Sequence, residues 1–191
     1  MHGIRRKTGA GGFFTACLAM AACGQVQEPA PFLPPPVTVA NGCGDGGYLR
    51  TTLYGAFEGV IDWSNGELDC EGMPRPDGEG ARLRLAGTAA DGLHSLAFII
   101  AMPSLERGAT ASELASNVTL IEEGSGRFFS TPGLESCWTD VGAQTAVEDA
   151  DNTYSISGTL YCITPLPEVN GDTSIMLREL HFTGLLDWNA R

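Results

Sequence analysis

The chain has 191 residues, with 11 Lys and Arg against 23 Asp and Glu, 43% hydrophobic residues and six cysteines. This length and composition fit one globular domain with additional segments, and the acidic balance argues against a nucleic-acid-binding protein. Lys7 is the only lysine, which excludes P-loop lysines, Schiff-base lysines and Ser-Lys dyads from the rest of the chain.

The first 24 residues have the pattern of an export signal. Arg5, Arg6 and Lys7 form a basic segment, and the largely apolar residues 13–22 after it are too few to span a bilayer, which takes about 20. The sequence LAMAACG at residues 18–24 places small residues directly before a cysteine. It resembles the lipobox of bacterial lipoproteins that are cut by the type II signal peptidase.

This resemblance implies a lipid anchor. Residues 1–22 would be a signal peptide, and Cys23 would become the first residue of the mature chain and carry the lipid. Gly24 after the cysteine is similar to the outer-membrane sorting signal of enteric lipoproteins, so we expect a protein of the bacterial cell envelope, anchored to the outer membrane, with its domain in the periplasm or at the cell surface. The alternative is an ordinary secretory signal that is cut near Ala22.

Removal of the signal makes the chain more acidic. Eight arginines then face 23 acidic residues, which gives a net charge near −15. Such a surface repels nucleic-acid phosphates and anionic lipid headgroups. We therefore expect no nucleic-acid partner, and contact with the membrane only through the N-terminal lipid.

Residues 23–47 form the next predicted segment, a linker rich in proline and glycine. Pro29, Pro31 and the run 34–36 predict a disordered but extended stalk, about 3.1 Å per residue where the chain is proline-rich. The glycine-rich residues 41–47 then open the folded domain. They lack the following lysine or helix that a phosphate-binding loop needs.

Residues 48–191 are predicted to form one all-β domain. Alternation of apolar and polar residues, as in ARLRL at 81–85 and YSISGTL at 154–160, indicates half-buried antiparallel strands. The nearly continuous apolar run 96–102 predicts a central strand that is covered on both sides. One short helix is expected at 111–116, because Thr110 and Glu113 have the spacing of a capping box. The predicted architecture is an antiparallel β-sandwich or jelly roll, with a β-barrel as the second choice.

A short match links the two ends of this domain. FEGVIDW at 57–63 is repeated as FTGLLDW at 182–188. Alternation places the Phe, the Gly, the second aliphatic residue and the Trp of each copy on one face, and Asp62 and Asp187 on the other. We expect the first and last strands to occupy similar positions in one sheet, and one arrangement places them side by side.

The tryptophans of this match have two interpretations. Trp63 and Trp188 could stack on sugar rings while Asp62 and Asp187 bind hydroxyls, or both tryptophans could be buried anchors of strand ends, which is the commoner role of large aromatic residues. For Trp138, next to Cys137, the sequence favours a core residue packed on a disulfide.

Four cysteines remain after the signal and the anchor, Cys43, Cys70, Cys137 and Cys162. In an exported protein an even number fits two disulfides, and four cysteines allow three pairings. A hairpin centred on residues 149–150 would place Cys137 opposite Cys162, because they lie symmetrically about that turn. Cys43 would then pair with Cys70.

Candidates for catalysis and metal binding are few. His94 beside Ser95, and His181 with Glu179 on the same strand face, are the positions from which a hydrolase site could be assembled by folding. Calcium is the one candidate cofactor, because oxygen ligands crowd a single turn, although a solvated hairpin turn explains the same composition. The residues of that turn are Glu148, Asp149, Asp151 and Asn152.

The sequence thus predicts an envelope lipoprotein that displays a disulfide-bonded β-sandwich on a stalk. We expect it to act by binding a glycan or an envelope protein and to need no cofactor. The alternatives are a hydrolase, secreted or anchored, and a purely structural envelope component.

Overall fold

The fold is known from a computed structural model that describes residues 43–44, 46–64 and 66–190. The predicted signal peptide, Cys23 and the stalk up to residue 42 lie outside these residues. Within the described part of the chain no helix is long and apolar enough to cross a membrane.

Eleven strands and one short 3-10 turn make up the described domain, in agreement with the all-β prediction. In chain order they are β1 (Tyr48–Gly55), β2 (Gly59–Ser64), β3 (Leu68–Pro74), β4 (Ala81–Thr88), β5 (Ser95–Met102), β6 (Ala111–Glu123), β7 (Arg127–Ser130), η1 (Leu134–Ser136), β8 (Cys137–Ala146), β9 (Thr153–Cys162), β10 (Leu166–Pro167) and β11 (Ser174–Asp187).

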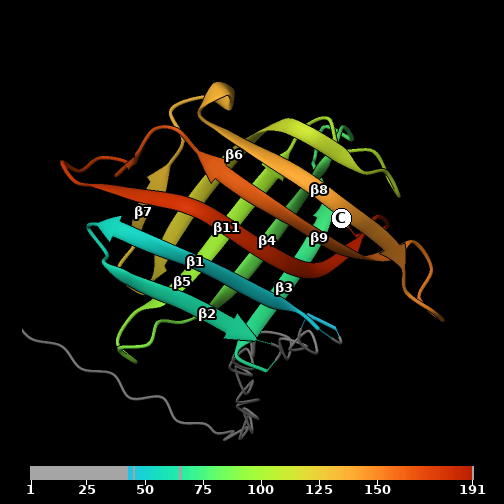
Figure 1. Cartoon of the computed structure of the whole chain (residues 1–191), viewed down its shortest axis with the longest axis horizontal. Coiled ribbons are helices and arrows are strands. Elements are labelled where there is room, and N and C mark those ends of the chain that lie inside the picture. The colour runs from blue at the N-terminus through green and yellow to red at the C-terminus, as the bar shows by residue number, and fades with distance from the viewer. Residues whose placement is uncertain (1–42, 45, 65, 191) are drawn as a thin grey trace, which may run out of the picture. The chain divides into compact units, whose positions relative to one another are not determined.

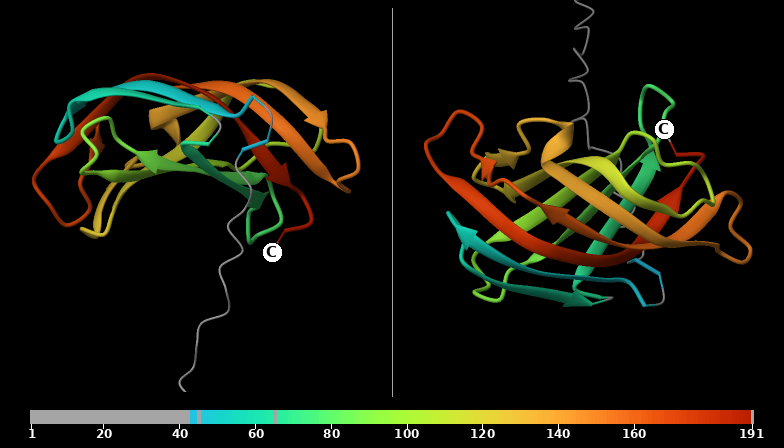
Figure 2. Two further views of the ribbon diagram at one scale, coloured as in Figure 1. Left: turned by 90° about the horizontal axis from the view of Figure 1, so that it is seen from below. Right: turned by 45° about the horizontal axis from the view of Figure 1, so that its top comes forward.

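The strands form one antiparallel sheet in the order β2-β1-β11-β9-β8-β6-β5-β4-β3, with β7 paired to β6 and β10 paired to β11. The sheet folds over on itself at β6, which pairs with β8 through its first residues and with β5 through its last. We call β2, β1, β11, β9 and β8 the front layer, and β5, β4 and β3 the back layer. The front strands cross over the back strands in Figure 1, and Figure 2 shows the two layers edge on. The result is a nearly closed barrel, so the sandwich and the barrel predictions both fit.

The helix expected at 111–116 is wrong, because this segment is the start of β6. Ala111 pairs with Val141 and Leu114 with Thr139, with a bulge between these two pairs. In the bulge Glu113 has a φ of 52°, and its backbone N–H donates to Asp140 Oδ1 at 2.7 Å instead of to a helix cap. A bulge increases the local twist, which suits the strand at which the sheet folds over.

The strands at the two ends of the sheet, β2 and β3, follow each other in the chain and are connected between Ser64 and Leu68. We call this junction the seam. Next to this seam, β3 packs on β11 so closely that a Cβ atom on Gly72 would lie 2.2 Å from the carbonyl oxygen of Leu185. Only glycine allows two backbones to approach in this way. The Cys43–Cys70 disulfide lies at the same seam and confirms the predicted pairing.

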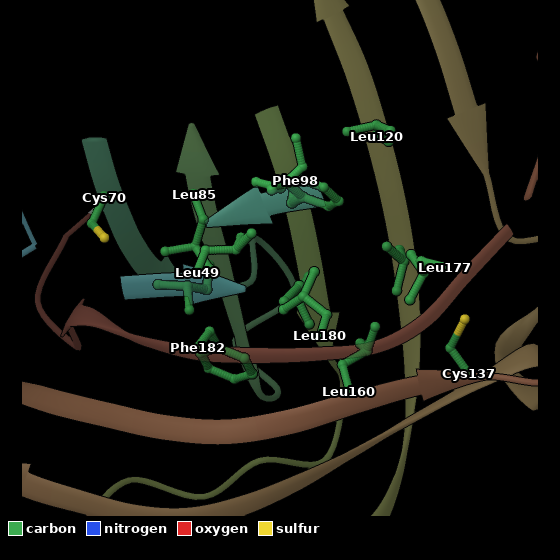
Figure 3. Close-up of a cluster of buried hydrophobic side chains, with 14 of the residues drawn as sticks. Leu49, Cys70, Leu85, Phe98, Leu120, Cys137, Leu160, Leu177, Leu180 and Phe182 are labelled. Atoms are coloured by element: carbon green, nitrogen blue, oxygen red, sulfur yellow. The ribbon is translucent and has the colours of Figure 1, made fainter. Parts of the chain in front are cut away.

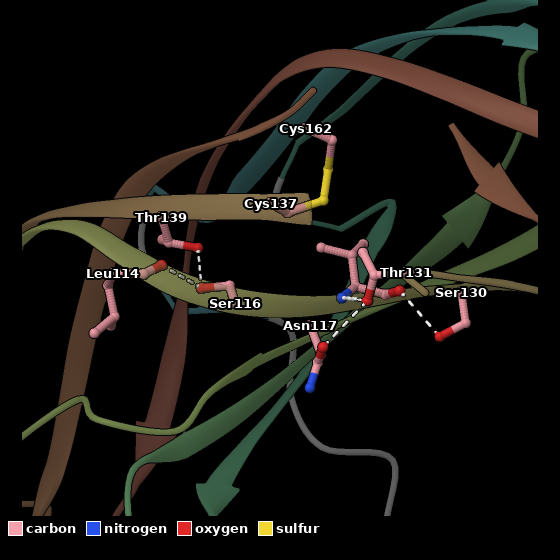
Figure 4. Close-up of a disulfide and its surroundings, with 9 residues drawn as sticks. Leu114, Ser116, Asn117, Ser130, Thr131, Cys137, Thr139 and Cys162 are labelled. Carbon is pink, nitrogen blue, oxygen red and sulfur yellow. Dashed lines mark hydrogen bonds between the residues drawn. A yellow bond between two sulfur atoms is a disulfide. The ribbon is translucent and has the colours of Figure 1, made fainter. Parts of the chain in front are cut away.

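The second disulfide joins Cys137 to Cys162. The two cysteines lie directly opposite each other in the β8–β9 hairpin, as predicted. Figure 4 shows two buried hydroxyl groups nearby that have partners. The hydroxyl oxygens of Ser116 and Thr139 are 2.8 Å apart, and Ser116 also donates to the Leu114 carbonyl. Buried polar groups that keep partners avoid a desolvation penalty.

The core fills the space between the layers (Figure 3). Alternate residues of both layers point inward, and Phe98, Phe129 and Phe182 are its largest fully buried side chains. Strand β5 is central in sequence position and pairing, but Ile99 and Ala101 on its outer side are only partly buried. Ala97 on the same outer side is buried, so the expectation of full cover is met on the inner side and only in part on the outer side.

The strands of the internal match, β2 and β11, lie in one sheet but are not neighbours. Strand β1 lies between them, because it forms a hairpin with β2 and uses its other edge to pair with β11. The predicted alternation holds for the inward residues Ile61, Trp63, Phe182 and Leu186, all of which are buried. The side-by-side arrangement was wrong.

Candidate ligand-binding site

Trp63 is a core residue. Its side chain is 4% exposed, packs edge-on against Phe98, and donates its indole N–H to the Thr88 carbonyl at 2.7 Å. It has no free ring face for a ligand. Asp62 beside it is exposed and forms an ion pair with Arg50, with Nε and Oδ1 2.7 Å apart.

Trp188 lies just past the end of β11, in a turn. Trp63 in β2 pairs with Leu49 in β1, and Leu49 in turn pairs with Phe182 in β11. Trp188 lies six residues further along the chain than Phe182. Trp188 is partly buried and donates its indole N–H to Gln144, while Asp187 accepts the backbone N–H of Asn189. The structure therefore does not bring Trp63, Asp62, Trp188 and Asp187 together as one platform for a glycan.

Trp138 points outward, contrary to the expected core packing. Cys137 faces the core, so the next residue of the same strand faces solvent. There Trp138 stacks on Tyr161, its direct partner in β9, with ring centroids 5.9 Å apart. Period-2 geometry explains the error, since two adjacent strand residues cannot both face the core.

The candidate calcium turn has a structural role. Glu148, Asp149 and Asp151 are exposed in the β8–β9 turn, where Asp149 and Asn152 adopt positive φ values of 61° and 57°. Asn152 accepts a hydrogen bond from Arg107 at 2.8 Å. Among the described residues no group of three or more His, Cys, Asp or Glu side chains is arranged to hold a metal ion.

A pocket of about 270 Å³ opens where the β1–β2 turn meets the β4–β5 loop. Its wall includes Leu53, Ile61 and Leu96 from the core, so its inner part is apolar. Phe57 of the β1–β2 turn and His94 of the β4–β5 loop both line it and contact each other edge to face, with their ring centroids 5.2 Å apart. This pocket thus joins residues from both layers.

His94 is held at this pocket by carboxylates. Its Nδ1 atom lies 2.5 Å from Asp91 Oδ2, and its Nε2 atom lies 3.5 Å from Glu122 Oε1. The pKa of Asp91 is lowered, mainly because its carboxylate accepts the backbone N–H of Leu93 and also because it is bonded to His94. The loop therefore presents an oriented imidazole beside an ionised carboxylate.

Besides His94, the ring of Phe57 contacts the side chain of Arg127. Its guanidinium carbon lies 5.4 Å from the centre of the Phe57 ring and 5.1 Å from that of Phe129, within the range of cation–π attraction. It also forms a two-pronged bond to Glu168, at 2.8 and 3.2 Å. This bond, together with the Thr173 hydroxyl, lowers the pKa of Glu168 to about 2. The network fixes the loops around the pocket before any ligand binds.

The sequence pointed to only part of this site. Phe57 belonged to the internal match and His94 was considered for a hydrolase, but Arg127 and Glu168 were missed. These two residues are 41 positions apart, and no local pattern relates them.

His181, the other histidine considered for a hydrolase, lies away from this pocket and has two neighbours. Its Nδ1 atom lies 3.0 Å from the Thr159 hydroxyl, and its Nε2 atom lies 3.5 Å from Glu179.

Comparisons with family models, curated proteins and solved structures find no match for this chain. The functional interpretation therefore depends on the geometry and chemistry of the described residues.

Proposed function

We propose that this chain is a lipoprotein of the bacterial cell envelope, anchored to the outer membrane through Cys23, whose β domain binds a small ligand. The lipobox-like sequence at residues 18–24 supports the anchor. The two disulfides support an oxidising compartment such as the periplasm or the cell surface.

The observation that carries the binding function is the pocket lined by Phe57, His94 and core residues such as Leu53. Its volume of about 270 Å³ exceeds the roughly 150 Å³ cavity that accommodates benzene in an engineered protein core. It would hold a single ring or a short alkyl group against its apolar inner wall. Glu58 and Asp91 are the carboxylates among its lining residues, so the polar end of the ligand is a cation or a hydrogen-bond donor.

The test is a thermal melt of the disulfide-bonded protein with arylalkylamines and with carboxylates of the same length. A ligand at 100 times its dissociation constant adds about 2.7 kcal/mol of stability, which moves the melting temperature by several degrees. We expect the amines to stabilise the protein. The variant Ala90→Leu, which narrows the pocket, should abolish the shift.

Ala146→Leu, at an exposed position at the end of β8, is the matched control and should retain the shift. A flat panel, or an amine effect that survives Ala90→Leu, would refute binding in this pocket.

A hydrolase is the second candidate, and one observation favours it. The Thr159 hydroxyl, the His181 ring and the Glu179 carboxylate lie in a chain of contacts at 3.0 and 3.5 Å. This is the order of groups in a nucleophile, base and orienting acid. All three lie on an open sheet face, where water weakens the electrostatic stabilisation that acyl transfer needs. Ester hydrolysis that is lost in both Thr159→Val and His181→Ala would establish this alternative.

A further inference from the structure

A row of polar side chains crosses the outer face of the front layer, away from the pocket. The row contains one residue from each of five strands, and successive members are direct partners in register. At about 4.8 Å between strands it is roughly 19 Å long. From β8 to β2, strands that lie side by side in Figure 1, its members are Asp140, Thr159, His181, Arg50 and Asp62.

Contacts within the row hold these side chains in place. Arg50 bonds to Asp62 at 2.7 Å, the Thr159 hydroxyl lies 3.0 Å from His181 Nδ1, and Asp140 accepts the backbone N–H of Glu113. Each side chain still has further donor or acceptor positions, because a carboxylate accepts several bonds and a guanidinium donates five. The row therefore offers oriented donors and acceptors to solvent.

Aromatic rings flank the row on both sides. Trp138 and Tyr161 stack on each other two residues from Asp140 and Thr159 along their strands. On the other side, Arg50 lies over the ring of Tyr48 at 5.2 Å. Rings beside hydrogen-bonding groups form a surface that is apolar in part and polar in part.

Two shallow hollows extend along the row. One of about 550 Å³ is lined by Arg50, Asp62, Glu179 and His181, among others. The other, of about 380 Å³, is lined by residues that include Tyr48, Asp140 and Thr159. We call the row together with these two hollows, which share no lining residue, the trough. It lies on the side of the sheet opposite the core. Within the described part of the chain, no further layer packs on this face (Figure 2).

The chemistry of the trough selects among occupants. A protein interface needs an apolar centre, but the large exposed hydrophobic residues of this trough are Tyr54 and Val60, which lie at one end only. A charged polymer needs one dominant sign, whereas Arg50 is paired with Asp62 and the acidic protein repels polyanions. A chain of uncharged sugars offers many hydroxyls for the row and apolar ring faces for the aromatic residues.

We propose that the outer face of the front layer binds an uncharged saccharide chain that lies across the strands from β8 to β2. The five residues of the row do not line the pocket, although Val60 and Ile61 line both the pocket and the larger hollow. This site also differs from the glycan platform considered for Trp63 and Trp188, since among these tryptophans and Trp138 it is Trp138 that lies on the outer face. Asp62 alone is common to both.

The test is affinity electrophoresis of the whole protein in gels that contain neutral polysaccharides, such as a β-glucan, a mannan, a xylan or a polymer of N-acetylglucosamine. A gel with an acidic polysaccharide serves for comparison. We expect retardation by at least one neutral polymer. The double variant Trp138→Ala/His181→Ala should weaken that binding at least tenfold.

Two variants separate this site from others. Glu71→Ala/Ile99→Ala changes residues on the outer side of the back layer, and Ala90→Leu changes the pocket, so both should bind the polymer like the unmodified protein. The melting temperature of each variant shows that the fold is kept. The proposal is overturned if no neutral polymer retards the protein, if the acidic polymer alone does so, if Trp138→Ala/His181→Ala binds normally, or if Ala90→Leu abolishes binding.

Discussion

The inner and outer faces of the front layer differ sharply in chemistry, although the residues that point to each face alternate along the same strands. In β11, Leu180 and Phe182 are fully buried against the back layer, whereas His181 between them is exposed. The inner face is apolar and carries the fold. The outer face is polar and aromatic, and its ion pair between Arg50 and Asp62, whose side chains are 60% and 59% exposed, contributes little to stability. The outer face is therefore free to change without loss of the fold.

The largest expected contrast comes from two adjacent residues. Phe182→Ala should lower the free energy of unfolding by about 3 to 5 kcal/mol, because it leaves a cavity in the core. His181→Ala should change it by no more than about 0.5 kcal/mol, as is usual for exposed positions. Denaturant unfolding of both variants measures the difference. Similar losses for the two would show that the outer face also carries the fold.

The disulfide at the seam should have the next largest effect. Cys43→Ala/Cys70→Ala opens a link between residues 27 apart, and chain entropy predicts a loss of about 3.5 kcal/mol. Cys137→Ala/Cys162→Ala, with a separation of 25, should lose a similar amount if entropy alone matters. If Cys43→Ala/Cys70→Ala lost much more unfolding free energy than the other variant, the packing of the inner face would depend on the covalent link at the seam.

Two glycines test how closely the inner side of the seam is packed. Gly72→Ala places a methyl group against the backbone of β11 and should cost about 1 to 3 kcal/mol. Gly59→Ala, in β2, meets nothing within 4 Å and should be neutral or slightly stabilising. Thermal unfolding of both variants gives the comparison. Equal melting temperatures would contradict the close approach of β3 and β11.

The smallest effect concerns pH and the loops around the pocket. The pKa of Glu168 is about 2 in the folded protein, below the usual 4.5, so the folded state holds this carboxylate ionised where the unfolded state binds a proton. Its contribution to stability is complete above pH 4.5 and is lost as the pH falls toward 2. Glu168→Gln should flatten the decline of the melting temperature over this range. An unchanged pH profile would show that the Arg127–Glu168 bond does not stabilise the fold.

Local pattern was enough for most of the strands, and it favoured the correct one of the three possible disulfide pairings. Alternation has a period of two in any half-buried strand, so it identifies strands before their partners are known. The symmetric placement of Cys137 and Cys162 about one turn predicted their pairing, because a hairpin aligns residues by counting from its turn. Local pattern failed at Glu113. Its spacing from Thr110 is that of a capping box and predicted a helix, but the backbone of this segment pairs with β8 as a strand.

By itself, therefore, the sequence determined an all-β domain and which residues of a strand share a face. It favoured one of three possible cysteine pairings, and the structure shows that one. Only the tertiary structure decided which face is covered. Trp63 and Trp188 are the last residues of the two matching heptapeptides, but only Trp63 is buried. It lies over Gly87 of β4, where a Cβ atom would be 2.7 Å from its ring. The pocket at Phe57 and His94 and the bond between Arg127 and Glu168 likewise exist because the sheet folds over at β6. Contacts between distant residues depend on that fold, and no local spacing records them.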